Sequence, residues 1–312
     1  MTRASMVAVV LAVLAFALAG CRETAPKAGT PIRAVVTVPP LKGILEPLLP
    51  PGSSIRVLMR PGQSEHGYEF TPSDMAELAG ADIVVHVGLG LEGNLAAAME
   101  KQKAPGRQVV CFADAVGIKE DDHHDHDHDH DHDHDHAHAD PHLWLNPVLV
   151  DALVPVLAQA VLKAEEARGR TSDEVLPRLD AAAMELRRRI REVDERWGES
   201  LKPYRDATIV THHNAFARPA ERYGFVVAEV FQLGEGELTP GDIARVAEAI
   251  RQQNVCAVFV EPQSDAAAAA RVAQLAGVPV GTLDPLGDGD WFGMMDRNLA
   301  ALLEHLAQPE SK

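Results

Sequence analysis

After residue 31 the chain alternates between two kinds of hydrophobic pattern. Short apolar runs rich in Val and Ile predict strands, and stretches with apolar residues three and four positions apart predict helices. The predicted strands cover 33–38, 55–59, 82–87, 108–112, 207–211, 225–230, 257–260 and 278–282. The predicted helices cover 72–79, 94–101, 215–223, 240–253, 265–276 and 293–306. Because strands alternate with helices, we expect two α/β lobes, each with a mainly parallel sheet flanked by helices.

Two longer helical patterns lie between the halves. The first covers 147–168 and has Pro147 at its first position, where a missing N–H costs nothing. The second covers 172–201, which corresponds to a helix ~45 Å long. Its apolar face consists of Leu176, Leu179, Ala183, Leu186, Ile190, Val193 and Trp197. We expect an N-terminal lobe at 31–168, a linking helix at 169–201 that limits hinge opening, and a C-terminal lobe at 202–312. A coiled-coil dimer is the weaker alternative, because the heptad run is short.

The first thirty residues have the layout of an export signal. Arg3 supplies a positive charge, an apolar run covers 6–18, and Leu-Ala-Gly-Cys ends at Cys21. The run is too short to span a bilayer comfortably. The ending resembles a bacterial lipobox, so we expect 1–21 to be a lipoprotein signal peptide, Cys21 to carry the lipid anchor, and 22–30 to be a tether. An ordinary signal peptide that happens to contain a cysteine is the alternative.

The chain is acidic, with a formal net charge of −17. This charge argues against nucleic acid as a partner, because phosphates need Lys and Arg. Two cysteines remain after Cys21, Cys111 and Cys256, each in a strand-like apolar run. We expect two buried free thiols in different lobes, and a disulfide stays open for an exported chain. No Cys pattern typical of zinc sites is present.

A tract of alternating His and Asp covers 123–138 within a polar segment at 120–140, and it holds nine of the fifteen histidines. It has no apolar side chains with which to form a core, so we expect a loop. Neutral imidazole binds zinc, copper and nickel well, and the carboxylates add attraction for cations. The tract therefore favours a collector of metal ions with several weak sites. An inert solvated loop and a pH-responsive element are the alternatives.

Other metal-ligating residues follow predicted strands or precede helices. His66 lies in a loop after 55–59, His142 precedes the helix at 147, His212 and His213 follow 207–211, and Asp284 follows 278–282. Ligands of open α/β sheets bind at the carboxyl ends of the strands, so these loops could converge between the lobes. Three imidazoles and one carboxylate suit tetrahedral zinc. The spacing alone supports this set weakly, because no local metal motif is present.

Four further residues have less direct interpretations. His86 lies on a predicted apolar strand and reads as a core or supporting residue, and His305 reads as solvated on a C-terminal helix. Glu65 beside His66 could compete as an oxygen ligand, and Glu261 reads as a support for the site.

Five motifs raise the specificity of this interpretation. They are PGQSEHGYEFTPSDMAELAGADIVVHVGLGLE, DPHLWLNP, THHNAFARPAERYGF, FVEPQSD and LDPLG. In this order they resemble the ZnuA-like group, the high-affinity zinc and manganese solute-binding proteins of ABC importers, from about residue 31 to 306. The resemblance implies two lobes joined by one long helix, with metal bound in the interlobe cleft.

Carried over by motif, the metal ligands are His66, His142, His213 and Asp284. The wording H-N-A-F selects His213, which leaves His212 as a strand-end residue. Histidine at the third ligand position and the His-rich loop both mark the zinc branch of the group.

The resemblance further implies that Zn²⁺ is the transported ligand, that an ABC-type permease in the inner membrane is the partner, and that the protein is periplasmic. We expect a monomer without catalytic residues. A manganese-binding protein and a periplasmic zinc buffer are the nearest alternatives. A zinc hydrolase that uses Glu65 as its base, and an adhesin-like lipoprotein with a structural metal, are more distant ones.

Overall fold

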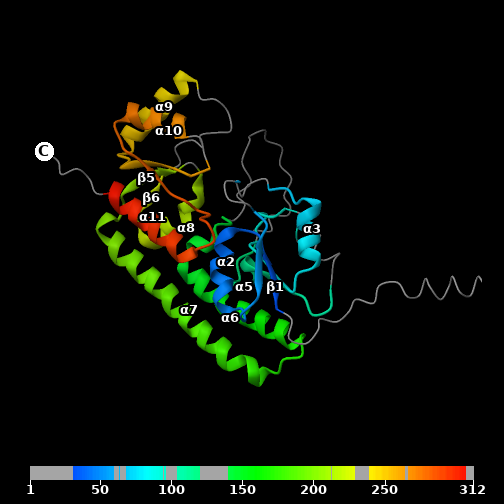
Figure 1. The fold of residues 1–312 in the computed structure, drawn as a ribbon. Coiled ribbons are helices and arrows are strands. Elements are labelled where there is room, and N and C mark those ends of the chain that lie inside the picture. The colour runs from blue at the N-terminus through cyan, green and yellow to red at the C-terminus, as the bar shows by residue number, and fades with distance from the viewer. Residues whose placement is uncertain are drawn as a thin grey trace, which may run out of the picture.

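The computed structural model contains two four-stranded parallel sheets with helices packed around them (Figure 1). It describes residues 31–59, 63, 68–93, 95, 104–119, 140–211, 213–228, 239–263 and 266–306. The described residues do not include the signal peptide, Cys21, the tether or the His/Asp tract. Of the predicted helix at 94–101 they include Leu95, and of the polar segment at 120–140 they include Asp140.

The first sheet has the order β2-β1-β3-β4, and all three pairings are parallel. Its strands are β1 (Arg33–Val36), β2 (Ser54–Val57), β3 (Ile83–His86) and β4 (Gln108–Cys111). The first-lobe helices are α2 (Pro39–Leu45), η1 (Glu46–Leu48), α3 (Pro72–Ala79), α5 (Phe112–Ala115), η2 (Leu143–Leu145) and α6 (Pro147–Glu166). All four residues of β3 are buried, as expected for a central strand covered on both faces.

The second sheet repeats the same order as β6-β5-β7-β8, also parallel throughout. Its strands are β5 (Thr208–Thr211), β6 (Val226–Val227), β7 (Ala257–Val260) and β8 (Val280–Thr282). The helices of this lobe are η3 (Lys202–Tyr204), η4 (Asn214–Phe216), α8 (Ala217–Tyr223), α9 (Pro240–Gln252), α10 (Ala266–Ala276) and α11 (Trp291–Leu306).

The two lobes also share one capping sequence. Thr71 and Asp74 form a capping box at the start of α3, and Thr239 and Asp242 form the same box at the start of α9. In both places a proline follows the threonine, where its fixed φ suits the first helical turn. Each helix follows the second strand of its lobe, so the loops that contain His66 and residues 229–238 occupy equivalent places in the topology.

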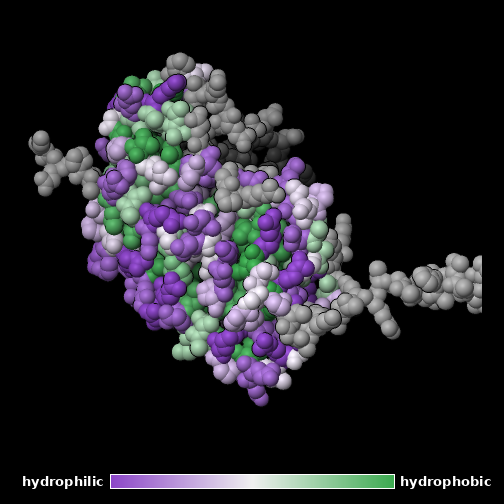
Figure 2. Space-filling view, in the orientation of Figure 1, coloured by the Kyte–Doolittle hydropathy of each residue, from purple (hydrophilic) through white to green (hydrophobic). Residues whose placement is uncertain are grey.

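Helix α7 (Ser172–Leu201) joins the lobes as one uninterrupted helix. It begins at a capping box made by Thr171 and Glu174, and it packs along α6, η1, α8 and α11. Figure 1 shows it running beneath both lobes, and Figure 2 shows mostly hydrophilic side chains on that side of the molecule. The buried residues of α7 are Val175, Leu179, Leu186, Ile190, Val193, Trp197 and Leu201, which confirms the three-four spacing over most of its length. The expectation for Leu176 was wrong, because its side chain is exposed and Val175 is buried in its place, and Ala183 is half-buried.

One hydrophobic core runs through both lobes. A single cluster of buried side chains extends from Ile32 in the first lobe through α6 and α7 to Leu306 at the end of α11. Helix α6 is the one described helix that is long and apolar enough to cross a membrane. It packs on α7, β3 and β4 with nine buried residues, which accounts for its apolar composition.

Close packing joins the lobes where α2 meets the start of α11. A Cβ placed on Gly43 would lie 2.7 Å from both the carbonyl oxygen of Gly289 and the backbone nitrogen of Trp291. The indole of Trp291 donates to the carbonyl of Trp144 over 2.8 Å, and the indole of Trp144 donates to the carbonyl of Pro285 over 2.6 Å. Both indoles are fully buried.

The structure confirms the order and type of the predicted elements that it describes, with strands one or two residues shorter than expected at their ends. The exception is β6, which has two residues. The strand predicted there, 225–230, extends into residues that the structure does not describe. Cys111 and Cys256 are free, half-buried thiols at different sheets. Burial raises the pKa of the Cys111 thiol to about 11.

The expectation for His305 was wrong. Its side chain is half-buried, Nδ1 lies 2.8 Å from the carbonyl oxygen of Ala301, and its ring packs edge-on against Phe259. The last turn of α11 lies over β7 and β8, so this face of the helix is covered by the sheet.

Candidate metal centre

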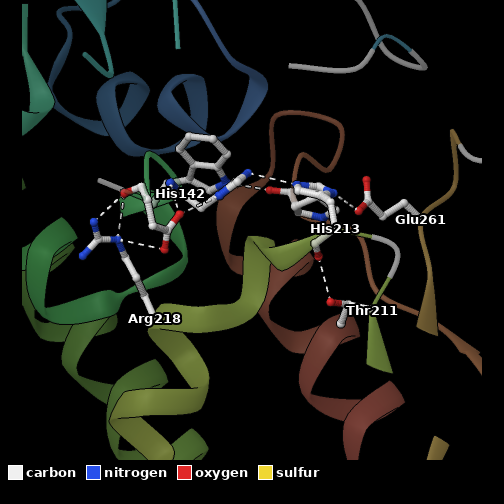
Figure 3. Close-up of polar contacts among 8 residues, drawn as sticks. His142, Thr211, His213, Arg218 and Glu261 are labelled. Carbon is white, nitrogen blue, oxygen red and sulfur yellow. Dashed lines mark hydrogen bonds and ion pairs between the residues drawn. The ribbon is translucent and has the colours of Figure 1, made fainter. Parts of the chain in front are cut away.

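Two predicted ligands from different lobes face each other. His142 precedes η2 in the first lobe and is 3% exposed, whereas His213 follows β5 in the second lobe. Their Nε2 atoms are 3.1 Å apart (Figure 3). The local chain explains both positions, because each histidine ends an extended or turn segment just before a short 3₁₀ turn. The predicted convergence of these two loops between the lobes is therefore present.

A carboxylate lies behind each imidazole. Asp140 Oδ1 is 2.7 Å from Nδ1 of His142 and also accepts the backbone N–H of His142 over 2.9 Å. Glu261 Oε1 pairs with Nδ1 of His213. A carboxylate only accepts hydrogen bonds, so Nδ1 is the donor of each ring, and a neutral ring of this tautomer presents its Nε2 lone pair toward the other ring.

Two facing lone pairs attract a cation. Neutral rings in this arrangement repel each other unless a proton or a metal ion lies between them. Zinc binds imidazole nitrogen at about 2.0–2.1 Å in a tetrahedron, which places two ligand nitrogens about 3.3 Å apart. The observed 3.1 Å is close to that spacing. Metal-binding histidines also commonly donate their second N–H to a carboxylate, as both do here.

Asp140 is held on two sides. Burial by itself raises the pKa of its carboxyl, but the hydrogen bonds from the ring and backbone of His142, together with the charge of Arg218, outweigh burial, so the pKa is lower than usual. Arg218 donates from Nε to the backbone carbonyl of Asp140 over 3.1 Å, and from a terminal nitrogen to the same oxygen. Its Nε is also 3.2 Å from Asp140 Oδ2. Arg218 thus holds the backbone of Asp140 through hydrogen bonds and its carboxylate through charge, since buried Oδ2 accepts no hydrogen bond among the described residues.

The surroundings of His213 are equally ordered. Glu261 is 6% exposed, and its second oxygen accepts the side-chain amide of Gln263 over 2.6 Å. Thr211 donates its hydroxyl to the carbonyl of His213 over 2.7 Å. The supporting role expected for Glu261 is consistent with this contact. His213 and Glu261 follow β5 and β7, the pair of strands at which the order of the second sheet reverses, where open α/β sheets bind ligands.

Asp284 follows β8 and has a rigid backbone. Its N–H donates to the side chain of Asn298 over 2.8 Å, and Asn298 returns a hydrogen bond to its carbonyl over 2.7 Å. Its Oδ1 accepts the backbone N–H groups of Leu286 and Gly287 at 3.0 and 2.8 Å. Both of these bonds use Oδ1, so Oδ2 is the oxygen that could turn toward a metal ion.

His66, together with Glu65 and His212, lies outside the described residues. The ends of the His66 loop are described. Met59 donates its N–H to the carbonyl of Thr37 beside β1, and Tyr68 donates its hydroxyl to the carbonyl of Leu58 over 3.1 Å. The described residues on either side of this segment, Met59 and Tyr68, therefore both lie at the carboxyl end of β2. Within the described part of the chain, no three His, Cys, Asp or Glu side chains form a group able to hold a metal ion.

His86 is a buried residue, as expected, and it pairs with Glu92 at the ends of β3 and β4. Its Nδ1 is 3.8 Å from Glu92 Oε2, which also accepts the N–H of Gly88. Glu92 Oε1 accepts from Thr37 and from the N–H of Val87, each over 2.7 Å. Both carboxylate oxygens accept hydrogen bonds from Thr37 or from the backbone of this loop. The bonds indicate that the pair stabilises the loop and is not a metal ligand.

Two further residues of the candidate site, Asp140 and Arg218, were not expected from the sequence. Asp140 was assigned to the polarity of the His/Asp tract, although its position two residues before His142 suits an aspartate turn that accepts the following N–H. That local signal was available. No feature of the sequence indicated a role for Arg218, because its contact with Asp140 joins residues 78 positions apart and depends on how the lobes pack.

A family model described as ZnuA, zinc-uptake complex component A, periplasmic, matches residues 34–305. The chain is 26% identical to the zinc-binding protein TroA of Treponema pallidum over 268 residues, which are 81% of this chain and 82% of TroA. It is also 26% identical to the manganese-binding lipoprotein MntA of Halalkalibacterium halodurans over 314 residues, which cover 96% and 97% of the two chains.

Solved structures share the fold. The periplasmic zinc-binding protein TroA from Treponema pallidum matches with a TM-score of 0.70 and 23% identity, covering 90% of this chain and all of that chain. The Zn(II)-bound AdcA from Streptococcus pneumoniae matches with a TM-score of 0.73 and 19% identity, covering 89% of this chain and 58% of that one.

Proposed function

Because the chain belongs to the family of ZnuA, the periplasmic component A of the zinc-uptake complex, we propose that it captures Zn²⁺ and delivers it to an ABC-type permease. The observation that carries the proposal is the pair His142 and His213, one from each lobe, with a carboxylate behind each ring and 3.1 Å between the facing nitrogens.

We assign four ligands to the ion: His66, His142, His213 and Asp284. His66 and Asp284 are assigned by their sequence motifs. The order of the elements supports them, since they follow β2 and β8 in the chain and the carboxyl ends of these strands face the same way as those of their neighbours. Four protein ligands close the coordination shell and leave no position for a reacting water, which suits binding and disfavours hydrolysis.

The His/Asp tract serves this site as a collector, by the chemistry of its sequence. Several weak sites on it would raise the local concentration of zinc near the lobes. We further propose a monomer that is anchored through a lipid on Cys21, at the periplasmic side of an envelope membrane that holds the permease. The names of the lipoprotein relatives support the anchor.

Manganese is the second candidate metal, because one relative that aligns along nearly the whole chain is named as manganese-binding. Imidazole ligands favour zinc, whereas carboxylate, carbonyl and water ligands suit manganese. The three histidines of the proposed set therefore favour zinc. A periplasmic zinc buffer binds the same ion without a permease, so growth of a deletion strain separates it from an importer. Growth that fails in zinc-limited medium and recovers with added zinc supports the importer.

Zinc titration by calorimetry tests the site. We expect wild type to show one tight site and additional weak ones, and a deletion of 121–138 to keep only the tight one. His142→Ala should weaken the tight site at least about 100-fold, since it removes one of four ligands. His305→Ala is the matched control, because this half-buried histidine lies on α11 and is not a proposed ligand.

The pH dependence of zinc binding and competition by manganese also test the site. Affinity should fall below about pH 6, because protons compete for imidazoles whose ordinary pKa is about 6.5. Manganese should displace zinc only at large excess. Loss of the tight site in the tract deletion, or its persistence in His142→Ala, would contradict the assignment.

A further inference from the structure

Arg218 connects the two lobes at the metal centre. It lies in the first turn of α8 in the second lobe, and its guanidinium reaches Asp140 of the first lobe. Two of its nitrogens donate to the carbonyl oxygen of Asp140, and Nε is 3.2 Å from the Asp140 carboxylate. Both side chains are mostly buried, at 18% and 24% exposure. The contact therefore competes little with water.

The contact continues to the ligand. Asp140 Oδ1 receives two N–H groups of His142, one from the ring and one from the backbone. The opposite ring nitrogen of His142 faces His213, which belongs to the same lobe as Arg218. A closed circuit results, from α8 through Arg218, Asp140 and His142 to His213 and back to α8 through η4 (Figure 3).

We propose that Arg218 is a positioning residue for zinc binding, which holds Asp140 so that His142 presents Nε2 to the ion. This inference rests on the proposed function and adds a residue that touches no metal. Arginine suits the role because its planar fork donates two directed hydrogen bonds to one group, whereas lysine offers a single compact charge.

The same helix supplies a matched control. Arg222, one turn later on α8, pairs through two nitrogens with the carboxylate of Asp194 on α7. This pair also joins two elements, but neither partner contacts His142 or His213 in the described structure. Arg222→Gln therefore removes an arginine–aspartate pair of similar form from α8 without touching the metal centre.

The test measures zinc affinity by competition with a chelator, and the absorption spectrum of the Co²⁺ form, for wild type, Arg218→Gln, Arg218→Lys and Arg222→Gln. Loss of a residue that supports a metal ligand typically costs 10–100-fold in affinity. We expect Arg218→Gln to weaken zinc by about 10-fold or more and to alter the Co²⁺ spectrum. Arg218→Lys should recover part of both, and Arg222→Gln should match wild type.

A second arm uses Asp140→Asn alone and combined with Arg218→Gln. If Arg218 acts through Asp140, the double variant should lose no more affinity than Asp140→Asn alone. Additive losses would overturn the proposal, as would wild-type affinity and spectrum in Arg218→Gln. Equal losses in Arg218→Gln and Arg222→Gln would overturn it too, since they would indicate general destabilisation.

The failure of the proposed function looks different from these outcomes, because wild type itself would then show no tight site. Circular dichroism of each variant identifies one that fails to fold. If Arg218→Gln does not fold, Arg218→Lys is compared with wild type instead, since it keeps the charge and loses the planar guanidinium.

Discussion

At the residue scale, the candidate metal centre shows which contacts can be predicted from a sequence. His142 and Asp140 lie two residues apart, so their bond could be expected from the local pattern. His213 and Glu261 follow two neighbouring strands, and the βαβ rhythm predicts that their ends meet at one edge. Arg218 depends on the packing of one lobe against the other. No local pattern encodes such a contact, so it became visible only in three dimensions.

Glu92 illustrates a buried carboxylate with a structural role. Burial raises its pKa by itself, but His86 and the hydrogen bonds from Val87 and Thr37 outweigh burial, so the pKa lies below its ordinary value. The loop it holds bends through four left-handed residues, Gly88, Leu89, Gly90 and Gly93. Its bonds compensate for the strain that this backbone imposes on Leu89.

A Glu92→Gln variant should lower the free energy of unfolding by about 1.5–3 kcal/mol at neutral pH, the usual cost of losing hydrogen bonds to a charged group. The folded pKa is depressed, so this contribution is present above the unfolded value of about 4.3 and is lost as pH falls through the folded pKa. Urea unfolding between pH 7 and pH 3 measures it.

The difference between wild type and Glu92→Gln should therefore be largest near pH 7 and should shrink below pH 4. Glu304→Gln, at an exposed position on α11, is the control and should change little at any pH. A difference for Glu92→Gln that grew in acid would contradict the assigned direction.

At the scale of elements, the hydrophobic pattern located most helices and strands because each element encodes its own period and ends. The first residues of α7 and α3 follow from threonine capping boxes that are visible in the sequence. Strand ends were less certain, because the last residue of a strand is set by the neighbouring strand with which it pairs. His305 was misassigned for a related reason: a helix at the end of the chain can pack on a sheet that its own sequence does not reveal.

Two glycines inside helices should respond oppositely to alanine. Nothing lies within 4 Å of a Cβ built on Gly198 in α7, so Gly198→Ala should stabilise the protein by about 0.5–1 kcal/mol through helix propensity. Gly43 in α2 faces backbone atoms at 2.7 Å, so Gly43→Ala should destabilise it by about 1–3 kcal/mol. Thermal unfolding of both variants measures the contrast, and stabilisation by Gly43→Ala would contradict the close packing of α2 on α11.

At the scale of the whole molecule, the sequence predicted two lobes and a linking helix, but it did not predict that the lobes share a core. The cluster that begins at Ile32 and ends at Leu306 passes through α6 and α7 without a break among the described residues. The tryptophans add directional bonds across the junction. Opening such an interface exposes apolar surface at about 25 cal/mol per Å², so wide hinge motion is costly.

Zinc should therefore change the overall dimensions very little. We expect small-angle X-ray scattering of the chelator-treated and zinc-loaded protein to give the same radius of gyration within error, in contrast to binding proteins that close by hinge bending. A clear contraction on loading would contradict the shared core as the limit on motion. The tract deletion is the control, because it separates any change in the tract from a change in the lobes.

Asp140, two residues after the His/Asp tract, is held beside the candidate site, and this position has a consequence for kinetics. The sequence places His138 four residues before His142, and the structure fixes Asp140 between them through Arg218. An ion held near that end of the tract is tethered to the site, so its transfer is intramolecular. Short tethers produce effective concentrations of the order of millimolar. Such a concentration would make loading depend on how fast the tract releases zinc, and only weakly on how much free zinc surrounds the protein.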